Sequence, residues 1–173
     1  MTLDNGAPRM MTFHVPEDDR VLHALGLISL RHAHLDHILR MTIKTLAEVS
    51  IEEALDATAF VGSSALRDRV QKLARSRLGE GQALLKLQAI LERCRRATEK
   101  RNDWIHSIWA RELDGDPQLR TSDHKWTTPP SVEELQALAD EIGRLTGELN
   151  KARLEGFIHE ALAIRTRVPR KAE

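Results

Sequence analysis

The chain has 173 residues, and its 26 lysine and arginine residues balance 26 aspartates and glutamates. This length fits one domain of common size. The balanced charge argues against a global field that draws the protein to nucleic acid or membranes, so any basic site must be local. Tyrosine is absent and aromatic residues make up 3% of the chain, which argues against a sheet that stacks unpaired bases on aromatic rings.

Hydropathy and cysteine content indicate a cytoplasmic protein that makes no membrane contact. No apolar run approaches the roughly 18 residues that span a bilayer, and no secretory signal pattern opens the chain. The single cysteine, Cys94, excludes an internal disulfide framework. Because Cys94 lies in an apolar helical run, we expect an inert thiol in the core.

The first expected helix follows residues 1–15, which have the mixed composition of a loose leader. Pro16 and the three acidic residues after it are typical of a helix start. Core-type positions then recur three and four residues apart over about eight turns, which predicts one long helix. These positions are Val21, Leu25, Ile28, His32, Leu35, Leu39, Thr42, Leu46 and Val49. Gly26 could bend this helix but is not expected to end it.

Two shorter helical segments and a second long helix come next. Ser50 with Glu53 forms a capping-box pattern, and a later segment begins near residues 62–64 and ends at Gly79. The second long helix is expected after Gly81. Its stripe is Leu84, Leu87, Leu91, Cys94, Thr98, Arg101, Ile105 and Ile108.

The helical pattern stops near residue 113 and resumes at Ser131. Residues 113–130 hold turn chemistry, so we expect a loop or a small hairpin there. Ser131 with Glu134 is another capping box, and the last long helix should run to about Ile164. Residues 165–173 are basic and are expected to be a disordered tail.

Together these elements predict an all-α fold. Residues 16–164 should form a single domain, an up-and-down bundle of three long helices plus one or two short ones. A sheet of three or more strands would contradict this prediction.

The second long helix carries a polar cluster that does not look like packing. Arg101 points where the apolar stripe points, and a buried arginine is costly without a carboxylate, a phosphate or a hydrated interface. Asp36 of the first helix is our candidate carboxylate, because it lies four residues from His32 on that helix's stripe. Asn102 and His106 are neighbours on a second stripe.

Two other residues support this cluster in the sequence. Trp109 continues the second stripe three residues after His106, and Lys100 belongs to the basic stretch before Arg101 that also holds Arg93, Arg95 and Arg96. We expect the tryptophans of this segment, Trp104 and Trp109, to be packing residues and not residues that stack on bases.

The run Glu99–Trp109 (EKRNDWIHSIW) resembles the signature of the HEPN superfamily. That signature is an arginine, a polar residue that is often asparagine, and a histidine four to six residues later, on a late long helix of a bundle. Here these residues are Arg101, Asn102 and His106. The layout of roughly residues 17–164 is also similar to that of HEPN-like proteins.

The resemblance implies a metal-independent ribonuclease that needs no cofactor. Many members are toxins of toxin–antitoxin or antiviral systems, which implies an antitoxin protein as a partner. These members form homodimers in which the two copies of the motif face one composite cleft. Other members of the superfamily have lost the ribonuclease activity. The residues suit this chemistry, because an arginine can bind the scissile phosphate and a histidine can transfer protons near neutral pH.

Several alternatives remain open. The protein could be a non-catalytic helical interaction protein on the same scaffold, with His106 an ordinary histidine hydrogen-bonded to Asn102. His34 and His37 lie on one turn and invite a metal site, but we expect them to be solvated, and no metal is predicted. The other hypothesis for nucleic-acid binding is a helix-turn-helix over residues 51–78. Its basic residues, however, spread around the helix and do not line one face.

Overall fold

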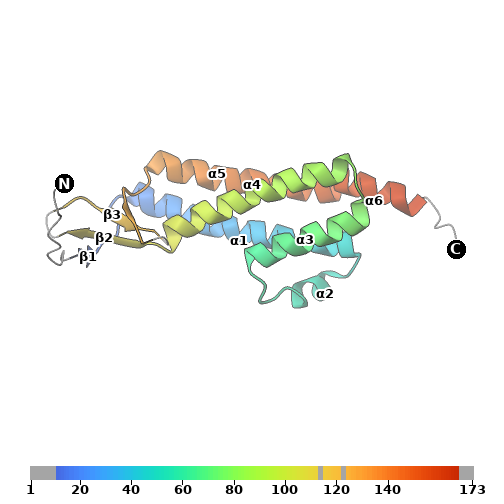
Figure 1. Cartoon of the computed structure of the whole chain (residues 1–173), viewed down its shortest axis with the longest axis horizontal. Helices are drawn as coiled ribbons and strands as arrows, with labels where there is room; N and C mark the ends of the chain where they lie inside the picture. The colour runs from blue at the N-terminus through green and yellow to red at the C-terminus, as the bar shows by residue number, and fades with distance from the viewer. Residues whose placement is uncertain (1–10, 113–114, 122–123, 168–173) are drawn as a thin grey trace, which may run out of the picture.

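In the computed structural model, three long helices run along the long axis of an elongated bundle (Figure 1). The structure describes residues 11–112, 115–121 and 124–167. The elements in chain order are β1 (Met11–Phe13), α1 (Asp19–Ala47), α2 (Ile51–Asp56), α3 (Ser63–Leu78), α4 (Gln82–Ile105), β2 (Ile108–Glu112), β3 (Gln118–Arg120), β4 (Trp126–Thr127), α5 (Val132–Leu154) and α6 (Phe157–Arg167).

Helix α1 is the centre of the bundle and packs against both α5 and α3. Helix α4 packs against the same two helices, α5 and α3. The strands gather at one end of the bundle and α6 lies at the other (Figure 1). The mostly helical bundle predicted from the spacing of apolar residues is therefore confirmed.

The core consists of the apolar stripes of these helices. Its fully buried large side chains are Ile28, Leu35, Leu39, Ile43, Leu46, Leu66, Leu87, Leu119, Leu135, Ile142, Leu145 and Leu149. Cys94 lies among them, and burial raises the pKa of its thiol to about 12. A thiol that stays protonated is a poor nucleophile, which agrees with the inert core cysteine expected from the sequence.

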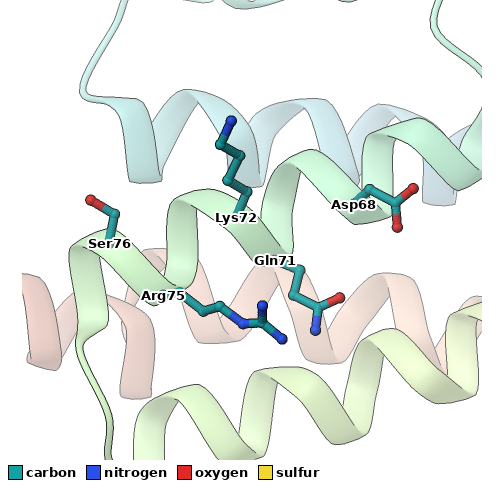
Figure 2. A pocket seen from close by; sticks show the side chains of 5 residues that line it. All are labelled: Asp68, Gln71, Lys72, Arg75 and Ser76. Atoms are coloured by element: carbon teal, nitrogen blue, oxygen red, sulfur yellow. The ribbon is translucent and has the colours of Figure 1, made fainter.

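The predicted helix ends are largely confirmed. Ser50 and Ser131 each accept a hydrogen bond from a backbone N–H three residues on, and Glu53 and Glu134 accept from the cap residues' own N–H groups. Helix α3 ends at Gly79, whose φ of 69° suits glycine. The exposed side of α3 carries polar side chains that line a shallow groove (Figure 2).

The all-α prediction is wrong at one end of the molecule, where four short strands form an antiparallel sheet in the order β1-β2-β3-β4. Strand β1 comes from the predicted loose leader, and β2 replaces the last expected turn of the second long helix. The register pairs Thr12 with Arg111 and Trp109 with Leu119. Strands of two to five residues are too short to show an alternating pattern in the sequence.

The last predicted helix is divided in two. Helix α5 ends at Leu154, and the N–H groups of Glu155 and Gly156 both donate to the carbonyl of Lys151. A Cβ at position 156 would lie 3.1 Å from the Cα of Ala152, so this tight turn suits glycine. Helix α6 continues past the predicted end at residue 164. The rest of the expected tail, residues 168–173, lies outside the described residues.

Candidate functional site

The Arg-Asn-x-x-x-His motif occupies the C-terminal end of α4. Arg101 and Asn102 belong to its last turn, and His106 follows as the C-cap with φ −100° and ψ −2°. The backbone N–H of His106 still donates to the carbonyl of Asn102 at 3.0 Å. The chain then enters β2, so the motif lies where the bundle meets the sheet.

The structure brings the three motif side chains together within one chain. Nη1 of Arg101 is 2.9 Å from Oδ1 of Asn102 and 2.7 Å from Nε2 of His106. A guanidinium can only donate hydrogen bonds, so His106 must accept through an unprotonated Nε2. The ring is then the neutral tautomer with its proton on Nδ1. Asn102 and His106 are exposed and Arg101 is half-buried, so the cluster opens to solvent.

The tryptophans beside the motif pack as expected. Trp104 is buried, and Nε1 of Trp109 donates to its carbonyl at 3.0 Å. Lys100 places Nζ 4.7 Å from the centre of the Trp104 ring, a cation–π contact. Trp109 does not continue the Asn102–His106 stripe, because α4 ends at Ile105 and Trp109 lies in β2.

Asp36 is not the carboxylate partner that we predicted for Arg101. Its Oδ1 accepts a hydrogen bond from the Ser63 hydroxyl at 2.7 Å, and its Oδ2 lies 3.8 Å from Nδ1 of His32. Among the described residues, no carboxylate lies within ion-pair distance of Arg101, and its Nε is buried without a hydrogen-bond partner. The positive charge of Arg101 therefore lacks a counterion within the described chain.

A buried polar cluster that lies next to the motif along α4 was not predicted from the sequence. Nε2 of His32 lies 3.2 Å from Oγ1 of Thr98, which is one turn before Arg101 on α4. The Thr98 hydroxyl donates to the carbonyl of Cys94 at 2.8 Å and accepts from Nη1 of Arg67 at 3.2 Å. Its proton is thus used, and His32 fills the remaining acceptor position as an Nε2–H donor.

Electrostatic interactions link this cluster to the motif. Burial lowers the pKa of His32, and the charges of Arg101 and Arg67 lower it further, while Asp36 opposes them. His32 is therefore held neutral. The available sequence signal was two polar residues, His32 and Thr98, in stripes otherwise made mostly of apolar side chains.

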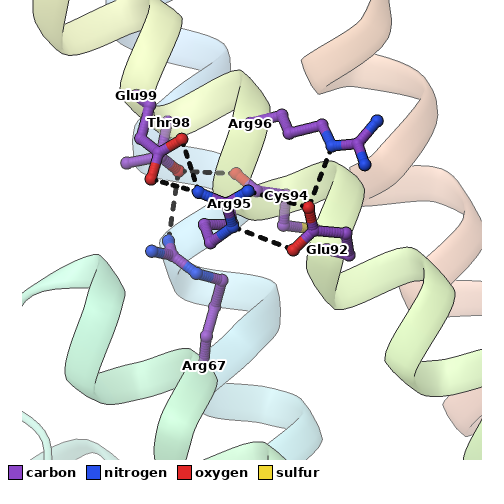
Figure 3. Close-up of polar contacts among 7 residues, drawn as sticks. All are labelled: Arg67, Glu92, Cys94, Arg95, Arg96, Thr98 and Glu99. Carbon is purple, nitrogen blue, oxygen red and sulfur yellow. Dashed lines mark hydrogen bonds and ion pairs between the residues drawn. The ribbon is translucent and has the colours of Figure 1, made fainter.

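The arginines that precede the motif are neutralised by acids. Figure 3 shows Arg95 between Glu92 and Glu99, and Arg96 bonded to Glu92. Arg93 reaches across to Glu141 and Glu148 of α5. Arg93, Arg95 and Arg96 therefore form surface ion pairs, and Arg101 differs from them in having no acid partner.

Residues considered for metal binding do not form a cluster in the described part of the chain. His34 and His37 are exposed on α1. No group of three or more histidine, cysteine, aspartate or glutamate side chains is arranged there to hold a metal ion. None of the described helices is both long and apolar enough to cross a bilayer.

The site contains the groups that phosphate chemistry needs. A guanidinium without a counterion can bind an anion in bidentate fashion, and an exposed neutral imidazole beside it can accept a proton. Asn102 adds an uncharged amide that can donate a hydrogen bond. No protein-family model, no curated protein and no solved structure matches the chain.

Proposed function

We propose that this protein is a metal-independent endoribonuclease of HEPN type, with Arg101, Asn102 and His106 as its active site. The observation that carries the proposal is the 2.7 Å contact between Nη1 of Arg101 and Nε2 of His106, at a solvent-exposed helix end. A half-buried arginine that bonds a histidine and no acid is suited to receive a phosphate.

In the proposed reaction, the Arg101 guanidinium turns from His106 to the scissile phosphate and stabilises its developing negative charge. This movement frees the Nε2 lone pair of His106, which accepts the proton of the ribose 2′-hydroxyl. The 2′-oxygen attacks the phosphorus, and the bond to the 5′-oxygen breaks. The products are a 2′,3′-cyclic phosphate and a 5′-hydroxyl end.

The leaving 5′-oxygen needs a proton that the same unprotonated histidine cannot supply. His32 is 6% exposed and engaged with Thr98, so it is poorly placed to reach RNA. We therefore propose a homodimer in which the partner copy's motif histidine, in its protonated imidazolium form, donates a proton to the leaving 5′-oxygen. Within this proposal the protein acts in the cytoplasm, as the toxin of a toxin–antitoxin or defence system, and an antitoxin protein would restrain it.

The test is RNA cleavage by the purified protein in excess chelator, on structured and unstructured substrates. We expect the wild type to cut and Arg101→Ala and His106→Ala to lose at least roughly a hundredfold in rate. Arg101→Lys should be nearly as inactive, because an ammonium cannot reproduce a bidentate phosphate contact. His37→Ala, which removes an exposed histidine of α1, should cut like the wild type.

A wild type that leaves RNA intact, or a His106→Ala variant that cuts equally well, contradicts the proposal. The protein would then be better described as a non-catalytic interaction protein. In that case Arg101 and Asn102 would act as a polar clamp at the end of the bundle.

A further inference from the structure

A second half-buried arginine lies beside the motif without a counterion. Arg67 projects from α3, and its Nη1 donates to Thr98 of α4 (Figure 3). Thr98 lies three residues before Arg101 and four before Asn102, so these side chains are neighbours on the helix surface. Among the described residues, no carboxylate lies within ion-pair distance of Arg67. Two unpaired guanidinium groups thus flank one turn of α4.

Both guanidinium groups act on the same buried histidine. The positive charges of Arg67 and Arg101 each lower the pKa of His32, so both guanidinium groups lie near its ring. Two half-buried cations close to one another repel, and each is partly desolvated. A bound polyanion would relieve both costs, because one phosphate could meet each guanidinium.

Beside Arg67, a hollow between α3 and α4 adjoins a second hollow along the exposed side of α3, and the two share Asp68 and Gln71 to form one shallow groove. Its α3 side is formed by Arg67, Gln71 and Arg75, which are spaced four residues apart and so share one face of the helix. Figure 2 shows Gln71 and Arg75 extending from the same side of α3. The α4 side of the groove includes Gln88 and Arg95 and leads along the helix toward Thr98.

The composition of this groove suits a sugar-phosphate backbone. Arg95 and Glu92 bond each other, and among the remaining charged residues of the groove the basic Arg67, Lys72 and Arg75 outnumber the acidic Asp68. Glu92 is already bonded to Arg95 and Arg96. No aromatic ring lines the groove, so contacts there would be with phosphate and sugar and would carry little base preference.

We propose that Arg67 and the α3–α4 groove bind the RNA strand adjoining the scissile phosphate, with Arg67 holding the neighbouring phosphate. This inference rests on the proposed function and adds to it a single-stranded substrate path that leads away from Arg101. Arg67 is assigned a binding role, and its contact with Thr98 positions the guanidinium at the inner end of the groove.

The test measures binding of a short single-stranded RNA to the non-cleaving His106→Ala protein as a function of salt. Adding Arg67→Ala should weaken the Kd about tenfold and reduce the slope of log K against log salt by about 0.7, the value for one phosphate contact on a single strand. Unchanged affinity and slope in Arg67→Ala would overturn the inference.

A matched pair of charge variants keeps the test independent of the Arg67–Thr98 contact. Gln71→Glu places a negative charge in the groove, and Gln136→Glu places the same charge on the exposed side of α5. We expect Gln71→Glu to weaken RNA binding severalfold and Gln136→Glu to leave it unchanged. Equal effects of the two variants would show that only net charge matters, and the groove assignment would be wrong.

The outcomes separate this inference from the proposed function. If the wild type cuts RNA but Arg67 and Gln71 do not affect binding, the groove assignment alone is wrong. If binding depends on Arg67 and Gln71 but the wild type cuts nothing, the groove assignment stands and the ribonuclease proposal is wrong.

Discussion

His32 combines a titratable ring with almost complete burial, and we expect this combination to make the folded protein less stable in acid. The ring lies between the Thr98 hydroxyl and the Asp36 carboxylate, but only Thr98 is within hydrogen-bond distance. Burial lowers the pKa of His32, and the nearby positive charges of Arg101 and Arg67 act in the same direction. The folded protein therefore disfavours the imidazolium form, which an unfolded chain adopts freely.

We predict that the free energy of unfolding falls as the pH drops below about 6.5, the ordinary pKa of histidine. In that range the unfolded state binds a proton that the folded state excludes, so stability rises with pH and is fully present above the unfolded pKa. The slope from His32 can approach about 1.4 kcal/mol per pH unit, which corresponds to one proton. Urea unfolding between pH 7 and pH 5 measures it.

The control variants are His32→Gln and His34→Gln. His32→Gln keeps an amide that can bond Thr98 but does not titrate, so its stability should be nearly flat in this pH range. His34→Gln removes an exposed histidine of the same helix and should retain the wild-type slope. If His32→Gln follows the wild-type pH dependence, His32 is not the source of it.

At the scale of helices, two glycines should respond to the same substitution in opposite directions. Gly26 lies inside α1, and a Cβ there would meet nothing within 4 Å. Gly26→Ala should therefore stabilise the protein by about 1 kcal/mol, or roughly 3 °C in Tm. Gly79 ends α3 with φ 69°, so Gly79→Ala should destabilise by a similar amount. Calorimetry on both variants would contradict this account if the two shifts had the same sign.

The helices could be predicted from the sequence and the sheet could not, and the reason is physical. A stripe such as the one from Ile28 to Leu46 repeats over many turns, and the capping boxes at Ser50 and Ser131 mark helix starts locally. Strands β1 and β2 pair residues about 100 positions apart. Neither strand is long enough for its own sequence pattern to predict that pairing.

The same distinction applies to the candidate site. Arg101, Asn102 and His106 lie within one helical turn and its cap. Their spacing predicted that Asn102 and His106 are neighbours, whereas Arg101, on another stripe, meets His106 through its long side chain. His32, Arg67 and Thr98 come from three helices, and their contact depends on how α1, α3 and α4 pack. The predicted Asp36–Arg101 pair was wrong because Ser63 and His32 occupy the surroundings of that carboxylate.

At the scale of the molecule, we predict a homodimer that brings two motifs together through the sheet end. Ile108 follows His106 by two residues and is 44% exposed. Its Cα partner Arg120 pairs in turn with Trp126, so Ile108 and Trp126 lie on one face of the sheet. Phe13, opposite Ala110, shares that face and is also exposed. Exposed apolar side chains gathered on one face favour a protein contact.

Sedimentation at micromolar concentration should show a dimer. Ile108→Lys should shift the protein toward monomer and reduce RNA cleavage, since it places a charge in the predicted interface. Leu30→Lys makes the same kind of change at an exposed position of α1 and should leave the dimer intact. A wild type that is a stable monomer at this concentration would argue strongly against a composite active site.

In the proposed reaction, a neutral His106 held by Arg101 activates a ribose 2′-hydroxyl without a metal ion. The most direct measurement is the chemistry of the RNA ends produced by the wild type in excess chelator. We predict 2′,3′-cyclic phosphate and 5′-hydroxyl ends, formed by the wild type and absent with His106→Ala. Products with 5′-phosphate ends, or cleavage that stops when the chelator is added, would contradict the proposed reaction.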